Sequence, residues 1–206
     1  NYRILKAAQI VKDEGIAHPI LLGKESSIKA LIKEFQLDLQ DVTIIDPRSE
    51  EEDIRRNLFA NLLYTKRQRK GYTLSEAQKD MRERNYFGAA MVELKHADAL
   101  ISGLTRNYPD TIRPALQIIG VDKEAGVNRI AGMYILITKT GPMFFADTTI
   151  NRNPTTEELV EITLMTANAV KRFKMNPNIA MLSYSNFGAS DGEDPEKVFE
   201  WYRRRK

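Results

Sequence analysis

The chain has 206 residues, enough for one large α/β domain or two small ones with a real buried core. Hydrophobic residues make up 42% and charged residues 29%, and the net charge is only +3, so no basic block predicts a nucleic-acid partner. The absence of cysteine excludes disulfides, thiolate metal sites and a cysteine nucleophile. With only two histidines, we also expect no histidine-rich metal site.

The sequence gives no sign of a membrane or export segment. No apolar run approaches the roughly 20 residues that span a bilayer, and residues 1–15 lack a signal-like apolar region. We therefore expect a cytoplasmic protein with no membrane partner. The first residues already follow a helical pattern and include no initiator methionine, so we also expect a fragment of a longer protein.

Helical and strand patterns alternate over the first fifty residues. The apolar spacing predicts a helix that ends near Gly15, which suits a C-cap glycine, and a second helix over 26–35. Short apolar runs over 18–23 and 42–46 predict buried strands. This alternation is typical of a parallel sheet with helices on its faces.

The segment 50–95 has an almost wholly helical pattern. Gly71 interrupts it, and Thr73 followed by Glu76 predicts a capping box at the start of the next helix. The small residues around Gly88 would allow the last of these helices to pack closely against a neighbour.

A strand and a helix are predicted next, with a turn between them. The run over 97–102 predicts a buried strand, and 110–120 predicts a helix with Asp110 as its N-cap and Pro114 in its first turn. Ligands in open α/β sheets bind beyond the carboxyl ends of strands, so this turn is a candidate ligand site.

The polar, glycine-containing segment 121–126 marks a change of character. We place a boundary there, between a first α/β subdomain over 1–124 and a second over 125–206. Both subdomains are expected to be incomplete, because the first needs a returning C-terminal segment and the second is truncated.

Beyond the boundary, strands over 130–140 and 143–147 are predicted to form an antiparallel pair around a Gly-Pro turn. A long helix over 155–173, a last strand over 178–182 and a helix from residue 195 follow.

Two arginine-bearing segments are candidates for holding an anion. Lys66, Arg67, Arg69 and Lys70 form a basic cluster, and guanidinium groups bind phosphate bidentately. The alternative is a solvated helix end, where the dipole favours cations. Arg113 lies near a predicted helix N-terminus, which disfavours a cation unless an anion sits there. The alternative is a salt bridge from Arg113 to Asp110.

Polar residues also follow two predicted strands of the second subdomain. Asp147 and Asn151 could line a cleft, although the same residue types favour ordinary turns. Ser183, Ser185 and Gly188 could present hydroxyl and N–H groups to an oxyanion, or form a simple turn. Neither loop matches the Walker A or the GxGxxG pattern.

The order of these loops resembles the phosphotransacetylase (phosphate acetyl/butyryl transferase) family over essentially the whole chain. The stretches that carry the resemblance are YTKRQRKG (64–71), TIRPALQ (111–117), ADTTIN (146–151) and SYSNFG (183–188). The resemblance implies a three-layer αβα fold like that of isocitrate and isopropylmalate dehydrogenases, with two subdomains, a cleft between them and a dimeric assembly. It also implies conversion of acetyl-CoA and phosphate to acetyl phosphate and CoA, without a metal in the chemistry.

Carried over by position, the family motifs assign Arg67 and Arg113 to phosphate or acyl phosphate in the cleft. The substrate-binding residues that the resemblance implies are Arg67, Arg113, Asp147, Asn151, Ser183, Ser185 and Gly188. We expect Ser183 or Ser185 to face the cleft that the two arginines line. The family's final segment, with a Ser-Arg pair and a catalytic aspartate, does not occur in the sequence, so the general base and the other catalytic residues stay unknown.

The chain departs from the family between its SG turn and Arg113, where it carries Arg106, Asn107 and Tyr108. The stretches over 131–163 and 180–188 look similar to the phosphotransacetylase-like C-terminal domain of hybrid NADP-dependent malic enzymes. That resemblance implies a regulatory, oligomerising domain that senses acetyl-CoA, with NADP and a divalent metal only in the upstream malic enzyme part. The alternatives are an active stand-alone phosphate acetyl/butyryltransferase and a dehydrogenase of the related fold. The lack of a nucleotide-binding loop and of clustered metal-binding aspartates argues against the dehydrogenase.

Overall fold

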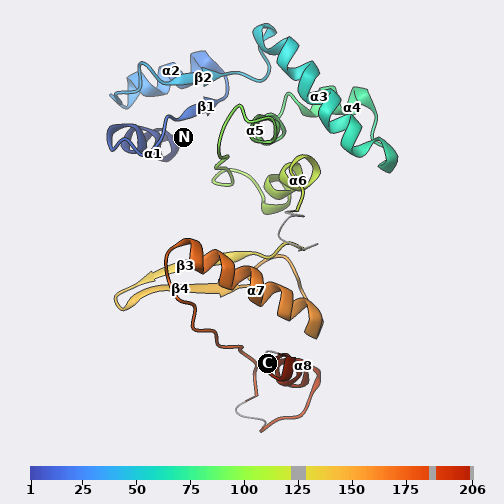
Figure 1. Ribbon diagram of the computed structural model, residues 1–206. Coiled ribbons are helices and arrows are strands. Elements are labelled where there is room, and N and C mark those ends of the chain that lie inside the picture. Colours follow the sequence, from blue (N-terminus) through green and yellow to red (C-terminus); the bar gives the residue numbers. More distant parts are fainter. Residues whose placement is uncertain (122–128, 186–188, 205–206) are drawn as a thin grey trace. The chain divides into compact units, whose positions relative to one another are not determined.

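The computed structural model describes residues 1–121, 129–185 and 189–204 (Figure 1). It divides into two compact units, Asn1–Gly120 and Val121–Lys206, and each is described here by itself. The predicted boundary between residues 124 and 125 lies outside the described residues.

The first unit begins with a β-α-β element. Its members are α1 (Tyr2–Asp13), β1 (Ile20–Leu22), α2 (Glu25–Glu34) and β2 (Thr43–Ile45). β1 and β2 pair in parallel, with Ile20 opposite Thr43, as the alternating pattern predicts. Gly15 follows α1 with a φ of +65°, a left-handed conformation that suits a residue without a Cβ. A small core lies between these elements and includes Leu5, Leu21 and Leu39.

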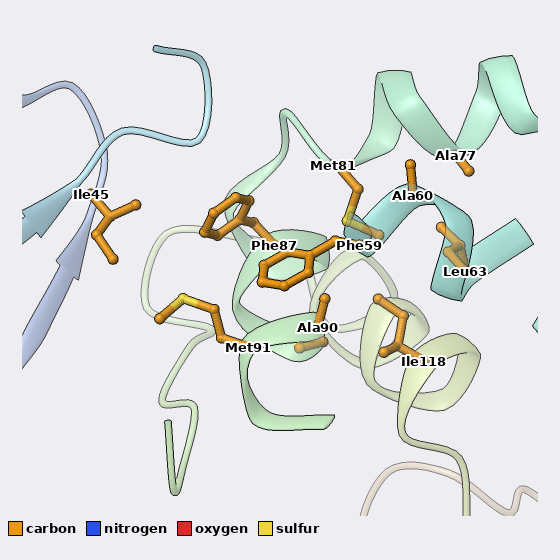
Figure 2. Close-up of a cluster of buried hydrophobic side chains, with 11 residues drawn as sticks. Ile45, Phe59, Ala60, Leu63, Ala77, Met81, Phe87, Ala90, Met91 and Ile118 are labelled. Atoms are coloured by element: carbon orange, nitrogen blue, oxygen red, sulfur yellow. The ribbon is translucent and has the colours of Figure 1, made fainter. Parts of the chain in front are cut away.

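Helices form the rest of the first unit. In chain order they are η1 (Glu50–Glu52), α3 (Asp53–Arg67), η2 (Gln68–Lys70), α4 (Leu74–Asp80), α5 (Arg84–Glu93) and α6 (Tyr108–Ile118). Figure 2 shows Phe59 of α3 and Phe87 of α5 meeting in the middle of their core, with ring centroids 4.9 Å apart. Both side chains are fully buried, and burying each one contributes roughly 1.5–3 kcal/mol.

Two predicted local features of these helices are confirmed. The capping box at the start of α4 forms, because Thr73 accepts from the backbone N–H of Glu76 and Glu76 accepts from that of Thr73. Gly88 is the site of close packing in α5: a Cβ there would lie 2.8 Å from Leu100 Cδ1 and 3.1 Å from Leu22 Cδ1.

Two predicted strands are absent from the segments where they were expected. Residues 97–102 and 178–182 have no strand, and the Ile101 and Leu182 side chains are 96% and 77% exposed. An apolar run favours burial, but a strand also requires a neighbouring strand with which its backbone can form hydrogen bonds. Neither segment pairs with β1–β2 or β3–β4.

The start of α6 also differs from the prediction. The helix begins at Tyr108 with Asn107 as its N-cap, so Asp110 lies inside the first turn. Pro109, whose fixed φ suits the first turn of a helix, allows this earlier start. Pro114 consequently lies in the helix interior instead of the predicted first turn, where it leaves one backbone carbonyl without a helical donor.

The described residues of the second unit form a hairpin and two helices. They are β3 (Met133–Thr138), β4 (Gly141–Ala146), α7 (Thr156–Arg172) and α8 (Glu193–Arg204). The antiparallel pairing is confirmed, although the two-residue connection is 139–140 and not the predicted Gly-Pro, because Gly141 already pairs with Thr138. Helix α7 packs on β4 and α8 packs on α7 (Figure 1), where the buried Trp201 donates its indole N–H to Thr163 Oγ1 at 3.1 Å.

The chain therefore has a mixed α/β fold. The sheets of the described residues are the parallel pair β1–β2 and the antiparallel pair β3–β4. Across those same residues, no helix combines the length and the apolar character needed to cross a bilayer.

Candidate anion-binding site

The C-terminal end of α6 is held by the basic residues that end α3. Arg67 Nε donates to the Gln117 carbonyl at 3.1 Å, and its Nη2 donates to the Leu116 carbonyl at 2.7 Å. Lys66 Nζ donates to the Ile118 carbonyl at 2.6 Å. The last carbonyls of a helix have no intrahelical partners and carry negative partial charge, so cations stabilise them. Arg67 and Lys66 therefore cap α6.

The remaining cations of the basic cluster, Arg69 and Lys70, lie exposed on η2. Next to them is an open depression of about 440 Å³. Its lining residues are Tyr64, Gln68, Arg69, Gly71, Tyr72, Thr73 and Leu74. The cluster is thus split, since two of its members face α6 and two face solvent.

Arg113 is exposed on α6, one helical turn before Gln117. The alternative of a salt bridge to Asp110 does not form, and none of the described carboxylates lies within ion-pair distance of its guanidinium. Burial raises the pKa of Tyr86, and the positive charge of Arg113 offsets part of that rise, so the two side chains are electrostatic neighbours. Within the described part of the chain, the guanidinium N–H donors of Arg113 are therefore open to other partners.

Two tyrosines that the sequence analysis did not select lie near each other, and Tyr86 contacts α6. The Tyr72 hydroxyl donates to Asp80, and the Tyr86 hydroxyl donates to Gln117 Oε1 at 2.7 Å. Burial, together with the charge of Asp80, raises the pKa of both phenols, so both remain neutral at physiological pH. The sequence feature that could have drawn attention to Tyr72 is its position directly after Gly71, at the end of the basic stretch.

Asn85, a third residue that sequence reasoning missed, contacts the N-terminal half of α6. Its side chain is buried, Nδ2 donates to the Asp110 carbonyl at 3.3 Å, and Oδ1 accepts from Ser102 Oγ at 2.7 Å. The Asp110 carbonyl is the one left without a donor by Pro114. The sequence feature that could have predicted such a partner is Pro114, because a proline within a helix leaves a carbonyl that needs a hydrogen-bond donor from elsewhere.

In the second unit, the Asp147 carboxylate organises the loop after β4. It accepts from the backbone N–H groups of Gly132, Thr149, Ile150 and Asn151 at 2.6–3.2 Å, and from Asn151 Nδ2 at 2.5 Å. Partial burial alone would raise the pKa of Asp147, but these donors outweigh burial and lower it.

The same loop requires close backbone approach. A Cβ at position 132 would lie 2.2 Å from Thr149 Oγ1 and 3.0 Å from Asp147 Oδ1, so only glycine fits there without a shift. Asn151 Nδ2 also donates to the Ile130 carbonyl at 3.0 Å. Asp147 and Asn151 thus form an ordinary turn, which the sequence analysis gave as the alternative to lining a cleft. That they contact a substrate stays a prediction.

The serine-rich loop is closed by its own hydroxyls. Ser183 Oγ accepts from the Ser185 backbone N–H at 3.2 Å. Ser185 Oγ accepts from the Ser190 N–H at 3.1 Å and donates to the Ser190 carbonyl at 3.2 Å. Gly188 lies outside the described residues.

The structure places the candidate residues in two groups. Arg67 of α3 and Arg113 of α6 both belong to the first unit, and Arg67 binds the C-terminal end of the helix that carries Arg113. The described members of the second group, Asp147, Asn151, Ser183 and Ser185, belong to the second unit. That a serine faces the same cleft as the arginines stays a prediction. Within the described residues, no group of three or more His, Asp or Glu side chains is placed to hold a metal ion.

This α/β fold is that of the phosphotransacetylases. The structure is similar to that of the EutD phosphotransacetylase from Staphylococcus aureus, with a TM-score of 0.81 and 30% identity over 99% of this chain and 61% of the other. It is also similar to a phosphotransacetylase from Streptococcus pyogenes, with a TM-score of 0.80 and 35% identity over 96% of this chain and 59% of the other.

The chain belongs to the phosphate acetyl/butaryl transferase family, whose model matches residues 1–203. It is 36% identical to the phosphate acetyltransferase of Bacillus subtilis over 95% of this chain and 59% of the relative. It is 33% identical to the phosphate acetyltransferase of Clostridium acetobutylicum over 95% of this chain and 60% of the relative. The chain thus spans about three fifths of the length of these relatives.

Proposed function

We propose that the protein catalyses acyl transfer between coenzyme A and inorganic phosphate, and that Arg113 binds the phosphate. In this reaction a phosphate oxygen attacks the thioester carbonyl of acetyl-CoA. The new C–O bond gives acetyl phosphate, the C–S bond breaks, and the CoA thiolate takes up a proton. CoA and acetyl-CoA are substrates, and the proposal requires no further cofactor.

The observation that carries this proposal is that Arg113 is unpaired among the described residues while its helix is anchored. Arg67, Lys66 and Asn85 bind backbone carbonyls at the two ends of α6. A guanidinium on an anchored helix can hold a phosphate at a fixed angle to a thioester, which lowers the entropic part of the barrier. Positive charge there also stabilises the oxyanion that develops on the thioester carbonyl.

Arg67 takes a different role in this proposal from the one carried over from the family motif. Two of its nitrogens already donate to α6 carbonyls, so it supports the site chiefly by fixing α6. Asp147, Asn151, Ser183 and Ser185 would act through the loops that they shape. The general base is not assigned.

The second candidate function is the acetyl-CoA-sensing domain of a hybrid NADP-dependent malic enzyme. The changed segment before Arg113 favours it, and Arg106 of that segment forms an ion pair with Glu83 at 2.9 Å. The relatives reported above are named as phosphate acetyltransferases, which favours the active enzyme over the malic enzyme context. The NADP and divalent metal of that context, the three-layer αβα arrangement, the homo-oligomer and the cytoplasmic location stay predictions.

The test is acetyl phosphate formation from acetyl-CoA and phosphate by the full-length protein, followed by release of the CoA thiol. We expect Arg113→Ala to lower kcat/KM about 100-fold, because a charged hydrogen bond to phosphate contributes up to about 3 kcal/mol. Arg113→Lys should lose less, since it keeps the charge.

Arg55→Ala is the matched control, because Arg55 is a half-buried arginine of α3 whose ion-pair partner among the described residues is Glu52. Full activity of Arg113→Ala would remove the assignment of phosphate binding. A wild-type protein that binds acetyl-CoA without turning it over would favour the sensing domain.

A further inference from the structure

Helix α6 carries a built-in defect next to Arg113. Pro114 has no backbone N–H, so the Asp110 carbonyl, four residues earlier, cannot make its helical hydrogen bond. Arg113 lies between these two residues, on the turn with the missing bond. An unsatisfied turn of this kind bends easily, and the direction of the Arg113 side chain would change with it.

Asn85 supplies the missing donor from a different helix. Its Nδ2 lies 3.3 Å from the Asp110 carbonyl oxygen. A carbonyl can only accept, so the amide nitrogen must face Asp110 and the amide oxygen is left for the hydroxyl of Ser102, 2.7 Å away. Both polar ends of the buried amide are therefore matched, and the orientation of Asn85 is fixed.

These bonds join three segments at one point. Asn85 lies in the first turn of α5, Ser102 lies in the segment between α5 and α6, and Asp110 lies in the first turn of α6. The side chain is only 6% exposed, so water competes little for either bond. A buried amide therefore bonds the Arg113-bearing turn from outside its own helix.

We infer that Asn85 is a positioning residue for phosphate, which acts by replacing the hydrogen bond that Pro114 removes and so fixes the turn that carries Arg113. The inference rests on the proposed role of Arg113 as the phosphate-binding residue. It makes a specific claim about chemistry, because an amide donor is required at position 85 and a side chain of similar shape that only accepts will not serve.

The pairing of Asn85 with Pro114 allows a double-mutant cycle. Asn85→Asp keeps the size and the acceptor for Ser102 but sets a carboxylate oxygen against the Asp110 carbonyl. Pro114→Ala restores a backbone N–H at position 114, which can bond Asp110 within the helix and release it from Asn85. If Asn85 acts only through this carbonyl, the second substitution should suppress the first.

The measurements are the affinity of the full-length protein for inorganic phosphate, by calorimetry, and the KM for phosphate and kcat in the thiol-release assay. We expect Asn85→Asp to weaken phosphate binding and raise KM about tenfold with a smaller change in kcat, which corresponds to one lost hydrogen bond. In the Asn85→Asp, Pro114→Ala double variant, both values should return to within about twofold of the Pro114→Ala protein, because the pair should couple.

Asn61→Asp is the matched control, since the Asn61 amide donates to the Asn57 carbonyl on the exposed face of α3 and should leave phosphate binding unchanged. A lower melting temperature of Asn85→Asp with unchanged phosphate affinity would reduce Asn85 to a structural residue and overturn the inference. Failure of Pro114→Ala to suppress the defect would also overturn it, as would a wild-type protein that binds no phosphate. Phosphate binding without turnover would contradict the proposed function. The phosphate affinities of the double-mutant cycle would then still test the role of Asn85.

Discussion

The two units use their polar candidate residues in opposite ways. In the first unit, the arginines divide the work, because Arg67 donates to α6 carbonyls while Arg113 has no carboxylate partner among the described residues. In the second unit, Asp147 accepts five hydrogen bonds from its own loop and from Gly132, and the serines bond one another. Residues of the right chemical type therefore differ in whether they have bonding capacity left for a ligand.

This difference separates a ligand-binding residue from one that shapes a loop. A saturated carboxylate contributes to folding, and its loss should be seen in stability. An unpaired guanidinium contributes little to folding, and its loss should be seen in binding. The two kinds of residue can therefore be distinguished by comparing stability with activity for the same substitutions.

The largest loss of stability is expected for Asp147→Ala, which would leave several backbone N–H groups of a half-buried loop without an acceptor. We expect the free energy of unfolding of the second unit to fall by about 3 kcal/mol, since each unsatisfied group costs about 1–3 kcal/mol and water will satisfy some of them. Trp201, the only tryptophan of the chain, lies in α8 of this unit and reports its unfolding by fluorescence in urea.

Asp191→Ala is the matched control, because the Asp191 side chain is exposed and makes no hydrogen bond with the described residues of the serine-rich loop, where its backbone carbonyl accepts from Tyr184. Equal losses for the two variants would show that Asp147 has no special role in organising the loop.

A smaller loss is expected for Arg67→Ala, which removes two hydrogen bonds from the C-terminal end of α6. We expect a cost of about 2 kcal/mol and about 30-fold faster hydrogen exchange in the last turn of α6, since hydrogen bonds to charged groups contribute about 1.5–3 kcal/mol. Arg69→Ala, an exposed neighbour, should leave exchange in α6 unchanged. If both arginines behaved alike, the division within the basic cluster would be wrong.

The capping boxes allow the two units to be compared with one chemistry. Thr73 caps α4 in the first unit and Thr155 caps α7 in the second, each with a glutamate three residues later. Each Thr→Ala substitution should cost about 1 kcal/mol. The loss at Thr155 should be seen by Trp201 fluorescence, whereas the loss at Thr73 should be seen only in hydrogen exchange of the first unit. Thr65→Ala, on the exposed face of α3, is the control for losing a hydroxyl.

The mildest effect is the acid dependence of the second unit. The folded pKa of Asp147 lies below the value of about 3.9 that is usual for an unfolded aspartate. Its stabilisation is therefore fully present above that value and is lost as the pH falls through the folded pKa. Urea unfolding followed by Trp201 fluorescence should show wild type losing stability below about pH 4. Asp147→Asn should show a flatter curve over that range, and parallel curves would contradict the role of its charge.

Local features were predictable from the sequence where the determinants are local. The Thr73–Glu76 capping box and the tight packing at Gly88 follow from residue types within a few positions of each other. The role of Arg67 could not be predicted in this way, because its acceptors are the carbonyls of Leu116 and Gln117, which lie 49 and 50 residues later in the chain. Likewise, the apolar run over 97–102 says nothing about whether a strand is present to pair with it.

Gly88 has a mechanical consequence for the first unit. The side chains of Leu22 of β1 and of Leu100, which precedes the Ser102 contact of Asn85, both fill the space beside Gly88 that a Cβ would occupy. A displacement of β1 would therefore be transmitted through rigid, close-packed atoms to the segment that leads into α6. A methyl group at position 88 would clash with Leu22 and Leu100 and push β1, α5 and the segment before α6 apart. The packing between the β-α-β element and the segment that leads into α6 therefore depends on a residue with no side chain.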